Sequence, residues 1–370
     1  MAPITSLLMG GLLAVQTALA HPGHSVAEEA LERREWLQNA KPRSVQACAS
    51  DLARRGQQER ALARRAELAQ HVRAKRGLKT LERRTFRDYN ISHESPLDVT
   101  LGSDERLLFA DNSSCLLQPE ATQGPYYIDG EIIRSDMSED EPGVPLFLDI
   151  QLIDTSSCDP VPAVFVDIWH CNATGVYSGV VNPSNGNPND LSNVNATFGR
   201  AVQQTDINGV VQFETIFPGH YVGRAIHMHV LTHNTESSII RTNSTLLSGN
   251  FTAQSSHVGQ IFFDQSLIAQ VEATAPYNTN QQELLPNEQD GILYAEALGS
   301  DPFMHYVLLG DDITDGVLAW ISLGIDPSAD VSMPSAGSWT KNGGDTNEDG
   351  PISSVGIPGN PQATDISQLP

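Results

Sequence analysis

Short apolar runs separated by turn-forming residues are the main pattern of the chain after about residue 90. The runs 146–153 and 163–169 combine Val, Ile, Leu and Phe with single polar residues, and a segment of Asp, Ser, Cys and Pro lies between them. This composition predicts two strands joined by a turn. Further strands are expected at 210–216, 221–231 and 258–263, and a helix at 264–272. Many short strands at this spacing predict a mainly β protein whose core is an antiparallel sandwich or barrel. Of these two architectures, we predict the β-sandwich.

The two ends of the chain have different patterns. Residues 25–38 and about 44–87 are rich in Ala, Leu, Glu, Arg and Gln, with apolar residues at roughly helical spacing, which predicts two helices with a break near Pro42. Beyond residue 330 the chain has few apolar side chains to offset its ordering entropy, which predicts a flexible C-terminal tail. The expected organisation is a signal peptide, a basic N-terminal helical segment, a β-sandwich domain and the tail, at 1–20, 21–90, 91–330 and 331–370.

Several features indicate secretion. The first 20 residues are an apolar run that ends in Ala18-Leu19-Ala20, the small-x-small pattern of a signal-peptidase site. No other run is long enough to span a bilayer, so we expect a soluble mature protein in the extracellular space. Glycosylation sequons, Asn-x-Ser or Asn-x-Thr, stand at Asn90, Asn112, Asn172, Asn195, Asn243 and Asn250.

Four cysteines fit the same compartment, because an even number in an oxidising environment suggests up to two disulfides. They are Cys48, Cys115, Cys158 and Cys171, and three pairings are possible. A bridge from Cys158 to Cys171 is not expected, because a strand over 163–170 would hold these residues too far apart.

The net charge of −23 is divided unevenly along the chain. Residues 21–90 hold 16 Lys and Arg against 9 Asp and Glu, whereas residues 91–370 hold 6 against 36. The acidic part should repel nucleic acid and anionic membranes, so neither is expected as a partner. Dibasic pairs in the basic part leave open a pro-segment cut at one of them instead of solvated helix faces. They are Arg54-Arg55, Arg64-Arg65, Lys75-Arg76 and Arg83-Arg84.

One stretch, 224–229, reads Arg-Ala-Ile-His-Met-His. In an extended strand successive side chains alternate between faces, so His227 and His229 point the same way while Ile226, Met228 and Val230 point the other way. Two imidazoles on one face are able to share a metal ion. Many His-x-His pairs are instead surface or core histidines, so the remaining segments of the chain decide between these two interpretations.

Three further segments carry candidate chemistry. Residues 124–127 read Gly-Pro-Tyr-Tyr, residues 169–178 read Trp-His-Cys-Asn-Ala-Thr-Gly-Val-Tyr-Ser, and residues 260–263 read Gln-Ile-Phe-Phe. Each tyrosine alone is more often a core or rim residue. Together with Arg-x-x-His-x-His in this order, from about residue 116 to 263, the segments resemble the iron(III) intradiol ring-cleavage dioxygenases, the family of catechol and protocatechuate dioxygenases.

The resemblance implies a ligand set for a non-haem Fe³⁺ cofactor: Tyr127, Tyr177, His227 and His229. A tyrosinate ligand at neutral pH fits Fe³⁺ better than Zn²⁺ or Fe²⁺, because the phenol has an ordinary pKa near 10 and needs a strong Lewis acid. The resemblance also implies that Arg224 stabilises negative charge on the substrate ring and that Gln260 orients a group at the metal. Tyr177 would be the ligand displaced by substrate.

The activity implied is the opening of a catechol-type ring by O₂ to a muconic-acid-type product, outside the cell. A homo-oligomer is possible, and the identity of the catechol is open. A cupin is disfavoured because its glutamate is replaced here by His233 or Asn234. A non-catalytic secreted sandwich that binds aromatics or polysaccharide stays open, as does the less favoured hypothesis of a copper monooxygenase that uses His21 as its N-terminal ligand.

Overall fold

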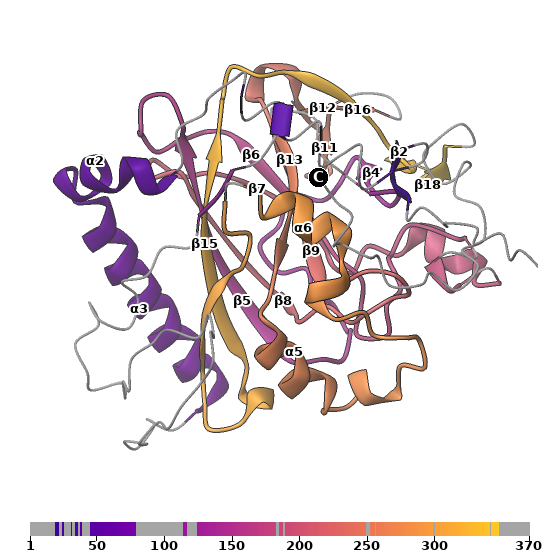
Figure 1. Cartoon of the computed structure of the whole chain (residues 1–370). Coiled ribbons are helices and arrows are strands. Elements are labelled where there is room, and N and C mark those ends of the chain that lie inside the picture. Colours follow the sequence, from indigo (N-terminus) through magenta and orange to yellow (C-terminus); the bar gives the residue numbers. More distant parts are fainter. Residues whose placement is uncertain are drawn as a thin grey trace, which may run out of the picture.

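The structure of the chain is a computed structural model (Figure 1). The structure describes residues 19–21, 24–25, 31, 34–35, 38, 45–78, 114–116, 124–182, 185–187, 189–248, 252–255, 257–298, 300–340 and 342–347.

Two sheets packed face to face form the centre of the molecule, as the strand pattern predicts. One has the order β14 (His305–Leu308), β15 (Val317–Ile325), β5 (Pro145–Asp154), β8 (Val210–Ile216), and β3 (Ser114–Leu116) also pairs with β15. The other has the order β13 (His257–Phe262), β9 (His227–His233), β6 (Phe165–Trp169), β7 (Arg200–Gln204). Alternate residues of both sheets share one apolar core, which includes Leu148, Ile150, Ile168, Val230 and Ile321. The β-sandwich core is confirmed.

The pairing departs from a purely antiparallel sandwich at its longest ladder. Strand β15 runs parallel to β5, from Val317 opposite Leu146 to Ile325 opposite Asp154. All nine residues of β15 are buried, because one face meets the sandwich core and the other, at Leu318 and Trp320, is covered by the N-terminal helix. A strand buried on both faces reads as a continuous apolar run, and this explains the sequence Val-Leu-Ala-Trp-Ile-Ser-Leu-Gly-Ile.

The N-terminal segment is helical, but with different bounds from those expected. A 3-10 turn, η1 (Val45–Cys48), leads into α2 (Ala49–Arg54) and then α3 (Gln57–Arg76). Gly56 and Gly77 both have φ 65°, a left-handed conformation that interrupts or ends a helix at low cost only for glycine. The single helix expected over 44–87 is therefore wrong in two respects: it is interrupted at Gly56, and it ends before Gly77. Residues 79–87 and most of 25–38 lie outside the described residues.

Helix α3 packs on the outer face of the β5 sheet (Figure 1). Ala66, Ala69 and Val72 contact that sheet. Arg64 donates from Nε and Nη2 to the two carboxylate oxygens of Asp149, at 2.7 and 2.9 Å, and Arg65 Nε lies 3.2 Å from the same group. These contacts make the basic segment 45–78 part of the folded unit, while removal of a pro-segment stays a prediction.

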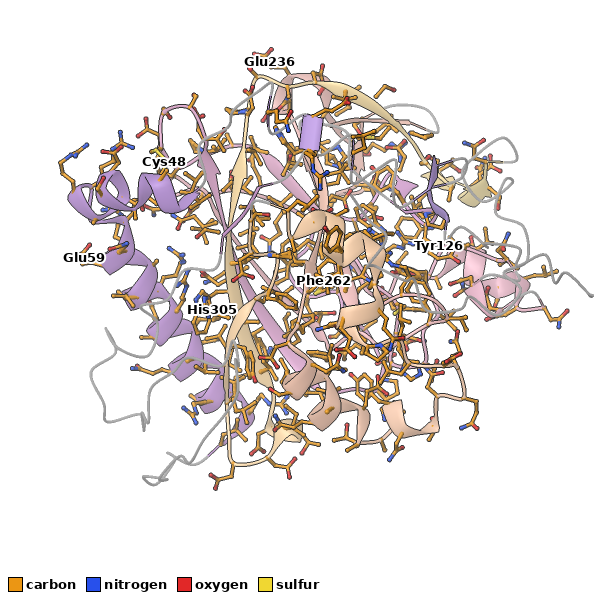
Figure 2. All side chains as sticks on the ribbon, in the orientation of Figure 1. Cys48, Glu59, Tyr126, Glu236, Phe262 and His305 are labelled. Carbon is orange, nitrogen blue, oxygen red and sulfur yellow. A yellow bond between two sulfur atoms is a disulfide. The ribbon has the colours of Figure 1, made fainter. Side chains whose placement is uncertain are left out.

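A disulfide also ties this segment to the sandwich. Cys48, labelled in Figure 2, is bonded to Cys158 in the turn between β5 and β6. Cys171 is a free, buried thiol, and the side chain of Cys115 lies outside the described residues. The expected absence of a bridge between Cys158 and Cys171 is confirmed.

The tail expected from residue 331 is instead structured as far as residue 347. Strand β16 (Val331–Pro334) pairs with β12 (Thr252–Ser255), and β17 (Gly337–Thr340) lies between β18 (Gly343–Thr346) and β4 (Ile128–Asp129). The few apolar side chains of this region are the reason, because Met333, Ala336 and Trp339 are buried in a second apolar cluster. Residues 348–370 lie outside the described residues.

The remaining elements are short. They are β1 (Leu19–His21), β2 (His24–Ser25), η3 (Leu191–Asn195), η4 (Thr235–Ser237), β10 (Ile239–Ile240), β11 (Leu246–Leu247), α5 (Gln265–Glu272), η5 (Tyr277–Thr279), η6 (Asn287–Gln289), α6 (Gly291–Glu296) and η7 (Ile313–Asp315). Among the helices of the described ranges, none combines the length and apolar composition needed to cross a membrane.

Candidate active site

The histidine pair lies where strand alternation places it. His227 and His229 are 2% and 1% exposed and share one face of β9, and their Nε2 atoms are 3.1 Å apart. Met228 and Val230 point into the sandwich core on the opposite face, and Ile226 packs with them. The predicted division of β9 into a histidine face and a core face is therefore confirmed in its geometry.

The hydrogen bonds of His227 fix which of its nitrogens is available. Nδ1 lies 2.7 Å from the carbonyl oxygen of Ala225, so Nδ1 carries the proton and Nε2 presents a lone pair toward His229. Burial, and then the positive charge of Arg224, lower the pKa of His227 well below its ordinary value. Burial and the neighbouring His227 do the same for the pKa of His229. Two neutral imidazoles that face each other in this way suit a cation between them.

The ring of His229 is held from two sides. It stacks on Trp169 with a centroid distance of 4.8 Å and an interplanar angle of 3°. Gly124 covers its other edge, and a Cβ atom at Gly124 would lie 2.7 Å from His229 Cε1. The glycine of the Gly-Pro-Tyr-Tyr segment is therefore required by the close approach of the imidazole.

Tyr177 lies beside the histidines and is fully buried. Its ring centroid is 6.0 Å from that of His229. Its backbone N–H donates to Asn185 Oδ1, and the Asn185 amide donates back to its carbonyl oxygen, both at 2.8 Å. The phenol oxygen has no hydrogen-bond partner among the described residues. Burial, and next the neighbouring Tyr221, raise the pKa of Tyr177 well above its ordinary value.

The second tyrosine at the histidines is Tyr221, which was not predicted from the sequence. Its hydroxyl lies 3.2 Å from His227 Nε2, and its ring centroid is 5.6 Å from both His227 and Tyr177. The strand expected at 221–231 begins at His227 instead, so Tyr221 is on the preceding loop, where it is only partly buried. A signal was present, because the Pro-Gly pair at 218–219, a sequence typical of turns and loops, stands shortly before Arg224.

Tyr127, expected as a ligand, points elsewhere. Its ring packs against Trp169, at 5.2 Å, and His233, at 6.4 Å. Burial raises the pKa of its phenol, followed by the charges of Asp167, Asp129 and Glu131. Its neighbour Tyr126 is the residue that approaches Tyr177, with ring centroids 4.7 Å apart. The expectation for Tyr127 is corrected because adjacent residues point to different sides of the chain.

Arg224 and Gln260 are brought together with the histidines as expected. Gln260 stands directly opposite His229 in the antiparallel pairing of β13 with β9. Arg224 Nη2 donates to Gln260 Oε1 at 2.5 Å. Arg224 Nε donates to Asp290 at 2.9 Å, a partner that no pattern in the sequence indicates.

A buried carboxylate cluster lies behind Tyr127. Asp129, Glu131 and Asp167 are at most 1% exposed. Arg200 donates to Glu131 Oε1 at 2.9 Å, and Asp167 lies 3.1 Å from His233 Nε2. Burial raises the pKa of Asp129 to about 6 and that of Asp167 to about 7. Burial and the adjacent Asp167 raise the pKa of Glu131 well above its usual range.

These raised pKa values predict a pH-dependent stability that Asp167→Asn reduces. Between about pH 4 and 7 the folded protein keeps a proton on Asp167 that the unfolded chain releases, so the free energy of unfolding falls as pH rises. Between pH 4 and 7 the free energy of unfolding should fall by about 1–3 kcal/mol less in the variant than in the wild type. Urea titration at several pH values measures this difference. Buried histidines such as His170, whose pKa burial lowers to about 4, act in the opposite direction in both proteins. Identical slopes would contradict the assignment.

Further candidate metal sites are not found in the described ranges, where no group of three His, Cys, Asp or Glu is arranged to hold a metal ion. His170 is occupied by the carbonyl of Cys171 and by Thr215. The donor set that the fold assembles is instead two tyrosines and two histidines.

The known proteins most informative about this chain are dioxygenases. The family model "Dioxygenase" matches residues 122–237. A solved intradiol ring-cleavage dioxygenase from Tetranychus urticae is 33% identical, with 58% of this chain and 96% of that chain covered and a TM-score of 0.46. The 3-chlorocatechol 1,2-dioxygenase from Rhodococcus opacus 1CP is 18% identical, with coverages of 55% and 70% and a TM-score of 0.33.

A third solved structure is the dioxygenase domain of a dioxygenase carbohydrate-binding protein fusion from Streptomyces sp. SirexAA-E. It is 20% identical, with coverages of 58% and 99% and a TM-score of 0.34. No curated protein matches the chain. The Tetranychus urticae enzyme is the relative that decides the family, since its sequence is matched over nearly its whole length at 33% identity. The chain belongs to the family of intradiol ring-cleavage dioxygenases and is an oxidoreductase.

Proposed function

We propose that this protein is an extracellular non-haem Fe³⁺ enzyme that opens a catechol-type ring with O₂ and releases a muconic-acid-type diacid. The observation that carries the proposal is the convergence of two phenols, Tyr177 and Tyr221, on the Nε2 side of His227 and His229. Strand β9 positions the two histidines. Hydrogen bonds with Asn185 hold the backbone of Tyr177, and Tyr221 lies on the loop that precedes β9.

The donor set fits Fe³⁺. The buried Tyr177 oxygen has no hydrogen-bond partner among the described residues, and His227 Nε2 already presents a lone pair. Burial raises the pKa of both Tyr177 and Tyr221, so neither phenol ionises at neutral pH without a strongly charged partner. Two phenolates and two neutral imidazoles favour a hard trivalent ion. When bound, Fe³⁺ would supply Lewis acidity and hold the two oxygens of the catechol.

The two tyrosines differ in freedom to move. Tyr177 is fully buried and its backbone is held on both sides by Asn185, whereas Tyr221 is partly buried on a loop that precedes β9. We therefore assign the displaceable position to Tyr221 and not to Tyr177. The Tyr221 oxygen would be suited to hold a proton from the incoming catechol, because the ordinary pKa of a phenol is near 10.

Arg224 and Gln260 form the polar side of the site. The Arg224 side chain is 14% exposed, and two of its N–H groups are directed at Asp290 and Gln260, which accept from Nε and Nη2. A fixed positive charge beside the two phenols stabilises negative charge that develops on a bound ring. Gln260, opposite His229 in the β13 pairing, would hold Arg224 in that direction.

The extracellular location is supported by the sequence features of secretion and by the positions of two sequons. Asn195 and Asn243 are exposed and accessible to a glycan. Asn172 is partly buried. We expect glycans on Asn195 and Asn243 before Asn172.

The test uses the secreted protein purified without chelators. We expect about one iron per chain, a visible phenolate-to-Fe³⁺ absorption band, and O₂ uptake with catechol that yields a product heavier by both oxygen atoms of O₂. A chain with iron and colour that consumes no O₂ with any of a panel of catechols would favour the non-catalytic binder. A colourless chain without iron, or one that holds copper, would overturn the proposal.

A further inference from the structure

We propose that Asp290 is a positioning residue for the reaction, which fixes the direction of the Arg224 guanidinium from outside the site. This inference rests on the proposed function. Asp290 precedes α6, beyond residues 122–237 that the family model matches. Its side chain is 1% exposed, so both carboxylate oxygens depend on protein donors.

Each oxygen of Asp290 has a separate task. Oδ2 accepts from Arg224 Nε at 2.9 Å and from the backbone N–H of Ala225 at 2.7 Å. Oδ1 accepts from the backbone N–H groups of Ile292 and Leu293, at 2.8 and 3.0 Å, and so caps α6. One buried carboxylate therefore joins the start of α6 to the segment that leads into β9.

This arrangement sets the orientation of the guanidinium at the site. Nε is held by Asp290 and Nη2 by Gln260. Two of the three nitrogens are thus fixed by groups that approach from different directions, which sets the plane of the guanidinium as well as its position. An ion pair with so little exposed surface also places the Arg224 charge where water screens it weakly, and its effect on a developing negative charge is larger there.

The residue also couples the site to the main chain. Ala225 donates its N–H to Asp290, and its carbonyl oxygen accepts from His227 Nδ1. The same peptide segment thus connects the carboxylate to the orientation of a candidate ligand. Movement of Asp290 would therefore change the orientation of the Arg224 guanidinium and, to a smaller extent, that of the His227 ring.

Asp290→Asn tests this role. The variant has similar volume but only one acceptor, so its amide nitrogen must face either the Arg224 and Ala225 donors or the α6 cap. Asp264→Asn is the matched control, because Asp264 caps α5 by accepting from Leu267 N at 2.8 Å, at a helix that does not include the Arg224 ion pair. The full-length, iron-loaded protein is used, and catechol is the substrate.

We expect kcat with catechol to fall about 10- to 100-fold in Asp290→Asn, with iron content unchanged, and to stay within about twofold in Asp264→Asn. In an Arg224→Gln background, Asp290→Asn should cause at most about a threefold further loss, because most of its effect passes through Arg224 and only the link through Ala225 to His227 remains. Full additivity of the two changes, or equal losses in the two Asp variants, would overturn the inference.

Hydrogen exchange gives a readout that does not require turnover. The N–H of Ala225 should exchange at least about tenfold faster in Asp290→Asn than in the wild type, and at an unchanged rate in Asp264→Asn. Unchanged exchange at Ala225 would contradict the positioning role even if activity fell. If the wild type fails to open any catechol while exchange responds as expected, the proposed function fails and the contact between Asp290 and the Arg224 segment stands.

Discussion

Tyr221→Phe is expected to lower turnover of catechol at least about 100-fold and to alter the visible band, whereas Tyr127→Phe is expected to keep both. The Tyr221 hydroxyl lies 3.2 Å from His227 Nε2, so its removal takes away one of the two phenols near the histidines. Tyr177, His227 and His229 remain, and three ligands should still retain iron. The band should therefore shift and weaken instead of vanishing, because one phenolate is left.

Tyr127→Phe is the matched control, since it removes the same atom from a buried tyrosine. The Tyr127 phenol lies near the carboxylate cluster, so the loss of its hydroxyl should cost about 1 kcal/mol of stability and leave iron content unchanged. Metal analysis, visible spectra and O₂ uptake compare the two variants directly. Loss of iron or of the band in Tyr127→Phe, with Tyr221→Phe unaffected, would restore the assignment made from sequence.

The two tyrosines show which part of the site can be predicted from sequence. The positions of His227 and His229 follow from the period of a strand, which is a local property, and the structure confirms them. Tyr127 is also near the site, because Gly124 touches His229. Whether Tyr126 or Tyr127 turns toward Tyr177 depends on how β4 meets β17. This contact involves a segment near the other end of the chain, which no local pattern contains.

Tyr221 was missed for a related reason. An apolar run over 221–231 reads as one strand, but residues 221–226 form a loop. Gly219 packs so closely on Ala173 that a Cβ atom would lie 2.4 Å from the Ala173 carbonyl oxygen. The next residue, His220, forms hydrogen bonds with Glu272 and with the carbonyl oxygen of Gln282. Tertiary contacts therefore override the strand pattern and turn Tyr221 toward the histidines.

The fold was predictable where a pattern had one structural solution. The strands at 146–153, 163–169, 210–216 and 258–263 lie close to β5, β6, β8 and β13, because a short run of β-branched and aromatic residues between turn-forming residues has few alternatives to a buried strand. The C-terminal strands were not predictable, since β16 to β18 hold their place through isolated side chains such as Trp339. A segment with few apolar residues stays unfolded only if those residues find no cluster to join.

Arg200 connects the segment that contains Tyr126 and Tyr127 with the loop that contains Tyr177. It is fully buried and donates to Glu131 Oε1 at 2.9 Å, to the Tyr126 carbonyl at 2.6 Å and to the Ser178 carbonyl at 2.9 Å. Tyr126 and Ser178 adjoin Tyr127 and Tyr177, so one guanidinium fixes the spacing between both segments. A buried charge whose donors are directed at several acceptors positions these segments more than it adds net stability.

Arg200→Met is accordingly expected to lower the free energy of unfolding by about 3–5 kcal/mol at pH 7.5, because it leaves Glu131 and two carbonyl oxygens without their donor. Arg134→Met is the control: Arg134 also bonds to backbone carbonyls and to Glu139, but its side chain is 20% exposed and that of Glu139 37%, so about 1 kcal/mol is expected. Urea unfolding measures both.

The loss in Arg200→Met should shrink at pH 5, because burial already raises the pKa of Glu131 and Asp167 and a proton can replace the missing guanidinium there. The same variant should bind iron more weakly at pH 7.5, since the Tyr177 loop loses its link to the segment that contains Gly124. A loss equal to that of Arg134→Met at both pH values would show that the carboxylate cluster holds its geometry without Arg200, and that the two tyrosine-bearing segments are positioned independently.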